Sequence, residues 1–121
     1  NYLQLDFRNS AGTRIVDAYT SANVATPPLN TWSNWLVSFD TSSASNRYVY
    51  VNDIDVTSSF NWDVFSNADI DFAPAATVQI KVGASAAGTS SWEGRLAHVF
   101  LDYTYRDLSV TANRRLFIDA E

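Results

Sequence analysis

Hydrophobic and polar residues alternate along much of this chain with the two-residue period of a β-strand. The clearest case is a pair of segments, residues 35–40 and 47–51, separated by the serine-rich residues 41–46. The hydrophobic positions that share one face of the first segment are Trp35, Val37 and Phe39. In the second segment one face carries Tyr48 and Tyr50, and the opposite face carries Val49 and Val51. Because Ser and Asn favour turns, the pattern predicts an antiparallel hairpin.

The same period predicts further strands on both sides of this hairpin. They cover residues 3–7, 14–19, 54–56 and 78–82. The longest predicted strand, residues 94–103, is apolar on both faces and is therefore expected at the centre of a sheet. His98 lies in its middle, and we predict that this histidine packs or hydrogen-bonds within the sheet.

Turns and loops separate the predicted strands. Residues 9–12 and 52–53 have the composition of turns. Residues 21–31, which contain two consecutive prolines, and residues 84–91, which are mostly small, are predicted loops. Residues 60–65 are rich in aromatic side chains but lack a clean period, so we predict an irregular loop packed on the sheet.

One short helix is predicted near the end of the chain. Ser109 or Thr111 is expected to cap it, and it is expected to run to about Ile118. Arg114 and Arg115 are expected on its solvated face. Short strands punctuated by turns, with this single helix, indicate an all-β fold: an antiparallel two-sheet sandwich with one short C-terminal helix.

Composition narrows the class of protein and of partner. The chain has 121 residues, enough for one domain with a hydrophobic core, and we predict a single domain over residues 1–121. Its net charge is −5 and it has no basic stripe, so nucleic acid is not an expected partner. No apolar run is long enough for a membrane span, so membrane insertion is not expected. The chain has no cysteine, and because it has no methionine we expect it to be a processed product or part of a longer polypeptide.

Three segments follow one another in an order that is typical of a known family. Residues 32–40 read Trp-Ser-Asn-Trp-Leu-Val-Ser-Phe-Asp, a tryptophan-led strand that ends in Asp. Residues 47–52 form a strand and turn, with Asp53 where the family usually has glycine. Residues 92–101, followed by Leu108 and Ser109, form a closing strand and a capped helix. In this order the segments resemble the laminin G-like, concanavalin A-like jelly roll.

The ending of the chain, residues 113–120, further resembles a sub-group of these jelly rolls found in bacteriophage structural proteins. This resemblance implies a jelly-roll domain in an oligomeric assembly. Domains of the family normally have strands before the position of Asn1, which would come from elsewhere in the polypeptide or from a neighbour. An uncovered strand edge would otherwise invite pairing with another chain.

No catalytic residues are predicted. Hydrolysis of a glycan uses two closely spaced carboxyl groups. The chain has only two glutamates, Glu93 and Glu121, and Glu93 has no partner carboxylate nearby in the sequence. His98 lacks a recognisable nucleophile and orienting acid. We therefore expect a protein that is not an enzyme.

Metal binding is an open alternative. Asp69 and Asp71, preceded by Asn67 and Asp63, offer the hard oxygen ligands that calcium prefers. With a spacing of two residues, the two aspartates would share one strand face. The family that the chain resembles sometimes binds calcium at a loop rim, but solvated aspartates at a strand edge give the same pattern. Calcium therefore stays a candidate cofactor without assigned ligands.

The candidate ligand-binding residues are Trp32, Trp62 and Asp63. Trp62 stands between Asn61 and Asp63, and Trp32 is two residues from Asn30 and from Asn34. Sugar recognition needs this combination, because a ring packs on the C–H face of a sugar and planar polar groups bind its hydroxyls. The alternative is that these rings cap the ends of the hydrophobic core.

Together these features predict a non-enzymatic recognition and assembly module. The resemblance favours a surface protein of a phage particle, a decoration or tail-fibre component that contacts glycans or neighbouring virion proteins in adhesion. A free-standing carbohydrate-binding domain of a secreted or cell-surface bacterial protein is the alternative, and a glycan hydrolase is the least favoured. The expected location is extracellular or on the virion surface.

Overall fold

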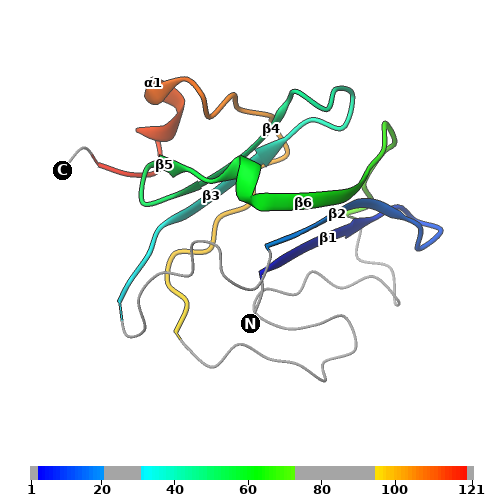
Figure 1. The fold of residues 1–121 in the computed structure, drawn as a ribbon, viewed down its shortest axis with the longest axis horizontal. Coiled ribbons are helices and arrows are strands. Elements are labelled where there is room, and N and C mark those ends of the chain that lie inside the picture. Colours follow the sequence, from blue (N-terminus) through cyan, green and yellow to red (C-terminus); the bar gives the residue numbers. More distant parts are fainter. Residues whose placement is uncertain (1–2, 21–30, 73–94, 120–121) are drawn as a thin grey trace.

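The computed structural model describes residues 3–20, 31–72 and 95–119, which form two small antiparallel sheets and one short helix (Figure 1). The first sheet has the strand order β1-β2-β6, with β1 at Gln4–Arg8, β2 at Arg14–Thr20 and β6 at Phe60–Phe65. The second has the order β3-β4-β5, with β3 at Trp35–Phe39, β4 at Arg47–Val51 and β5 at Ile54–Asp55. A 3₁₀ turn covers Thr57–Ser59, and helix α1 covers Thr111–Arg114. This content confirms the predicted all-β class.

The predicted hairpin at the centre of the sequence is confirmed. Strands β3 and β4 pair in register from Trp35 opposite Val51 to Phe39 opposite Arg47. The loop between them is closed by the backbone N–H of Asp40, which donates to the carbonyl of Asn46 at 2.7 Å. The next turn, into β5, has positive φ at Asn52 and Asp53, 49° and 64°. Two consecutive positive φ values are those of the type I′ turn that suits a two-residue hairpin loop.

Residues 60–65 form strand β6, so the prediction of an irregular loop was wrong. Ala18 pairs with Trp62 and Asp17 pairs with Val64, which leaves Asp63 as an extra residue in a β-bulge. The bulge shifts the alternation by one position. Phe60, Trp62 and Phe65 can therefore all face the second sheet, although their spacing does not fit a period of two.

The core lies between the two sheets. Its buried cluster consists of Ala18, Val49, Val51, Val56 and Phe60, with Leu3, Leu5, Trp35 and Trp62 packed against it. The rings of Phe7 and Phe39 connect the sheets edge to face, with centroids 5.0 Å apart. Apolar burial of this kind contributes roughly 25 cal/mol per Å². Trp35 and Phe39 of β3 and Val49 and Val51 of β4 therefore face the core, whereas Val37, on the same face of β3 as Trp35, is exposed.

The predicted central strand at 94–103 is wrong for residues 95–103, which form no strand. These residues are exposed on the surface, and His98 has a φ of 55°. A left-handed residue in the middle of the segment breaks the extended backbone and the alternation with it. His98 is exposed as well, so the prediction of a packed or hydrogen-bonded sheet histidine was also wrong.

The C-terminal segment covers the outer face of the second sheet. The backbone N–H of Arg106 donates to the hydroxyl of Ser38 at 3.2 Å, and Leu108 is fully buried. Burial, followed by the charge of Asp107, raises the pKa of Tyr105 to about 12. The irregular segment around residues 105–108 therefore shields this face of the sheet from solvent.

Helix α1 is tied to the turn between β4 and β5, beside which Figure 1 shows it. Arg114 and Arg115 both form ion pairs with Asp53, at 2.5 and 2.7 Å. The hydrogen bond from Arg114 is the main reason why the pKa of Asp53 lies below its ordinary value. The expectation that both arginines are merely solvated was therefore wrong, because Arg114 is largely buried and its guanidinium lies over the ring of Tyr50.

The predicted helix cap was also wrong. The N-cap position is Val110, without a side-chain hydrogen bond, and the hydroxyl of Ser109 bonds to Asp107 instead. The regular helix ends at Arg114, although backbone hydrogen bonds of the turn continue to Ile118. Thr111 is the first residue of the helix and does not cap it.

Several predictions fall outside the described residues. They are the strand at 78–82, the loops at 21–30 and 84–91, and the glutamates Glu93 and Glu121. Among the residues that are described, no helix is long and apolar enough to cross a membrane.

Candidate ligand-binding hollow

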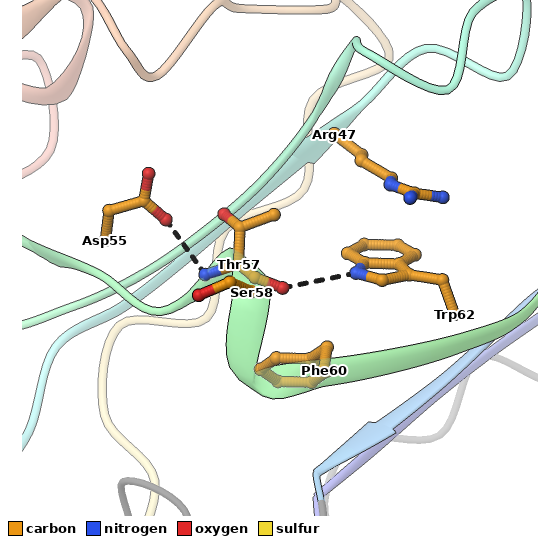
Figure 2. A pocket seen from close by; sticks show the side chains of 6 residues that line it. All are labelled: Arg47, Asp55, Thr57, Ser58, Phe60 and Trp62. Carbon is orange, nitrogen blue, oxygen red and sulfur yellow. Dashed lines mark hydrogen bonds between the residues drawn. The ribbon is translucent and has the colours of Figure 1, made fainter.

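A hollow of about 510 Å³ lies where the 3₁₀ turn leads from the second sheet into β6 (Figure 2). Its lining combines one guanidinium, one carboxylate, two hydroxyl side chains and two aromatic rings. These residues are Arg47, Asp55, Thr57, Ser58, Phe60 and Trp62. Side chains from two sheets and the turn between them therefore meet at one place.

The turn that forms the floor of the hollow is held by local hydrogen bonds. The carboxylate of Asp55 accepts the backbone N–H of Thr57 at 2.8 Å, an arrangement that reverses the chain after β5. The hydroxyl of Thr57 accepts the backbone N–H of Val49 at 2.8 Å, which ties the turn to β4. The carbonyl of Thr57 accepts the indole N–H of Trp62 at 3.3 Å (Figure 2). The indole is thus oriented by the turn.

Trp62 is the central ring of an aromatic cluster. The ring of Phe65 contacts it edge to face, with centroids 5.7 Å apart and planes at 85°. The centroid of the Phe60 ring lies 6.2 Å from that of Trp62. The guanidinium carbon of Arg47 stands 4.8 Å from the centre of the indole ring. This distance is within the range of a cation–π interaction. Trp62 therefore both packs against the core and presents part of its surface to the hollow.

Arg47 differs from the other half-buried arginines of the described chain. Arg106, like Arg114, has an aspartate partner within 4 Å, whereas Arg47 has only the rings of Trp62 and Phe65. Among the described residues, the only buried side-chain nitrogen without a hydrogen-bond partner is Nε of Arg106. The side-chain nitrogens of Arg47 make no hydrogen bond with the described residues and are not among the buried atoms, so they are open to solvent.

The three predicted ligand-binding residues do not come together. Trp62 lines the hollow, but Trp32 is exposed in the segment before β3 and does not line it. Asp63 is the bulged residue on the outer face of the first sheet, where its hydrogen bond with Tyr19 raises the pKa of that phenol. The sequence prediction missed Arg47, yet a signal was present, because Arg47 shares the inward face of β4 with Val49 and Val51.

The candidate calcium ligands lie elsewhere. Asp69 and Asp71 line a second hollow of about 460 Å³ together with Asn9. The expectation that they share a strand face was wrong, since the chain is irregular there and the N–H of Asp71 donates to the carbonyl of Arg8. Within residues 3–20, 31–72 and 95–119, no group of three or more His, Cys, Asp or Glu side chains is placed to hold a metal ion.

Comparisons with models of protein families, with curated proteins and with solved structures found no match.

Proposed function

We propose that this chain is a non-enzymatic recognition module that binds glycans in the hollow beside Trp62. The observation that carries the proposal is one oriented indole next to a carboxylate and hydroxyl groups in a single hollow. The part of the indole that lines the hollow and is not covered by Arg47 offers an apolar contact for the C–H groups of a sugar, and Asp55 and Ser58 offer polar atoms for its hydroxyls. Ser58 makes no hydrogen bond with the described residues and is exposed, so its hydroxyl is available to a ligand.

The carboxylate content of the hollow supports binding without catalysis. Among the described residues that line the hollow, Asp55 is the one carboxylate. Glycosidases place two carboxyl groups about 5–5.5 Å apart for retention or about 6.5–9.5 Å apart for inversion. A single carboxylate supports the orientation of hydroxyl groups but lacks the second group that hydrolysis needs.

We further propose that the domain is a jelly roll that serves on the surface of a phage-like particle, as a decoration or tail-fibre component. Two antiparallel sheets that face each other across an apolar core support the jelly-roll assignment. The placement on a virion depends on the resemblance of residues 113–120 to phage structural proteins. A secreted or cell-surface lectin-like domain uses the same hollow in the same way, because fold alone does not determine function.

We expect substitution Ser58→Phe to lower binding to a glycan array at least about tenfold, because a ring placed in the hollow excludes the sugar. Ser58 is exposed, so the fold should be retained. Ser66→Phe is the matched control, since Ser66 is exposed and does not line the hollow. The measurement is array signal for the wild type and both variants at equal folded concentration. The proposal is wrong if the wild type binds no glycan or if Ser58→Phe binds as the wild type does.

A second function, attachment to a neighbouring copy in an assembly, is favoured by the exposed apolar residues of segment 96–103. Their exposed fractions run from 49% for Leu101 to 72% for Tyr103, with Phe100 at 67%. Clustered exposed apolar side chains of this size mark interaction surfaces. They also make no strand pairing within the described chain.

We expect the wild type to self-associate in sedimentation experiments and Phe100→Ser to shift the distribution towards the monomer. Removal of an exposed ring reduces the apolar area that association buries. Val110→Ser is the control, because Val110 is also exposed and apolar but lies outside segment 96–103. A wild type that stays monomeric at its highest soluble concentration would argue against this second function.

A further inference from the structure

We propose that the hollow selects glycans that carry a carboxylate, and that Arg47 is the residue that pairs with this group. The inference rests on the proposed glycan recognition and adds the class of sugar. Uronic acids and sialic acids have this chemistry, because each joins a planar carboxylate to a ring with hydroxyl groups.

The first support is that the positive charge of Arg47 has no anionic partner among the described residues. Its side chain is half-buried at the inward-facing start of β4, and it has no carboxylate partner among the described residues. Water still reaches its N–H groups and two aromatic rings contact the guanidinium, but no carboxylate of the described chain neutralises the charge. A ligand carboxylate would supply the missing partner, and a charge-assisted pair of this kind is stronger than a neutral hydrogen bond.

The second support is geometry. The rings of Trp62 and Phe65 lie 4.8 and 5.3 Å from the guanidinium carbon of Arg47 and restrict its position. Its N–H groups remain open to solvent, since none of them bonds to the described chain. A planar guanidinium that is held against aromatic rings and still has free N–H groups is suited to two parallel hydrogen bonds to a carboxylate.

The third support is the distribution of charge across the hollow. Figure 2 shows Asp55 and Arg47 on opposite sides of the hollow, with Thr57 and Ser58 between them. A ligand with one anionic end and several hydroxyl groups matches this order. A polyanion such as a nucleic acid does not match it, because Asp55 and the net charge of −5 repel extended negative charge.

The test is an array of glycans in matched pairs. Glucuronate- and galacturonate-containing oligosaccharides stand beside their carboxyl-reduced counterparts, and sialyl-lactose stands beside lactose and sulfated lactose. We expect the wild type to bind the carboxylated member of at least one pair about tenfold more tightly. In Arg47→Gln this ratio should fall to near one. The ratio is measured within one protein sample, so a partly unfolded variant does not distort it.

Arg95→Gln is the matched control, because Arg95 is exposed, lies outside the hollow and carries the same charge. It should keep the wild-type ratio. Equal binding of carboxylated and neutral sugars by the wild type overturns this inference and leaves the proposed function intact. Binding of no sugar at all overturns the proposed function itself. A preference that survives Arg47→Gln removes Arg47 from the assignment, and a stronger preference for sulfated lactose overturns the choice of a carboxylate.

Discussion

Substitution Leu108→Ala is expected to lower the free energy of unfolding by about 3 kcal/mol, within the range measured for buried leucines in protein cores. Leu108 is 2% exposed and is among the largest fully buried side chains of the described residues. Its truncation removes apolar contacts and leaves a cavity under the segment that covers the outer face of the second sheet. The measurement is urea denaturation followed by tryptophan fluorescence.

The matched control for this prediction is Leu116→Ala. Leu116 belongs to the same C-terminal segment but is 61% exposed. Substitutions at exposed positions usually change stability by less than about 0.5 kcal/mol. If both variants lose the same stability, Leu108 does not anchor the segment, and the C-terminal cover of the sheet is packed differently.

Arg114→Ala is expected to cost on the order of 2 kcal/mol, and Arg115→Ala much less, although both arginines pair with Asp53. The side chain of Arg114 is 11% exposed, and that of Arg115 is 33% exposed. Arg114 also lies 4.6 Å above the ring of Tyr50 and donates to the carbonyl of Leu108 at 2.6 Å. Its loss therefore removes a stacking contact and leaves a part-buried carbonyl without its partner.

Chemical denaturation of the two single variants compares these effects directly. Arg115→Ala serves as the control for the loss of one positive charge next to the same carboxylate. An exposed ion pair contributes little to stability because water and salt screen it. Equal losses in the two variants would show that the common partner Asp53, and not the burial of Arg114, sets the energy.

The hairpin from β3 to β4 could be predicted because every signal for it is local. Alternating side chains define its two faces, and the residues of loop 41–46 have the chemistry of a turn. Alternation does not decide which face is buried, because Val49 and Tyr50 lie on opposite faces of β4 and both are buried. The turn at Asn52 and Asp53 is equally local, since both residue types tolerate positive φ.

Strand β6 could not be predicted from its period because of one residue. Asp63 is inserted against strand β2, and a single extra residue reverses the alternation for the rest of the strand. For segment 95–103 a strand was predicted but is absent. Its apolar pattern resembles that of a buried strand, but a strand also needs a neighbouring strand with which it can exchange hydrogen bonds. The described chain provides no such neighbour for it.

The candidate site likewise has one part that the sequence predicts and one part that only the tertiary structure shows. The residue types around Trp62 identified it as a candidate without any structure. The contribution of Arg47 depends on β4 and β6 lying opposite each other, which brings its guanidinium onto the indole although the two residues belong to different sheets.

By itself, the sequence determined the all-β class, the hairpin of β3 and β4, the tight turn after β4 and which residues of these strands share a face. Those features depend on contacts between residues that are near in the chain. Only the tertiary structure decided the bulge in β6 and the exposure of residues 95–103. It also decided the ion pair of Arg114 with Asp53 and the cation–π contact of Arg47 with Trp62. Each of them depends on which distant backbone or side chain lies opposite, and alternation along one strand carries no information about its partner.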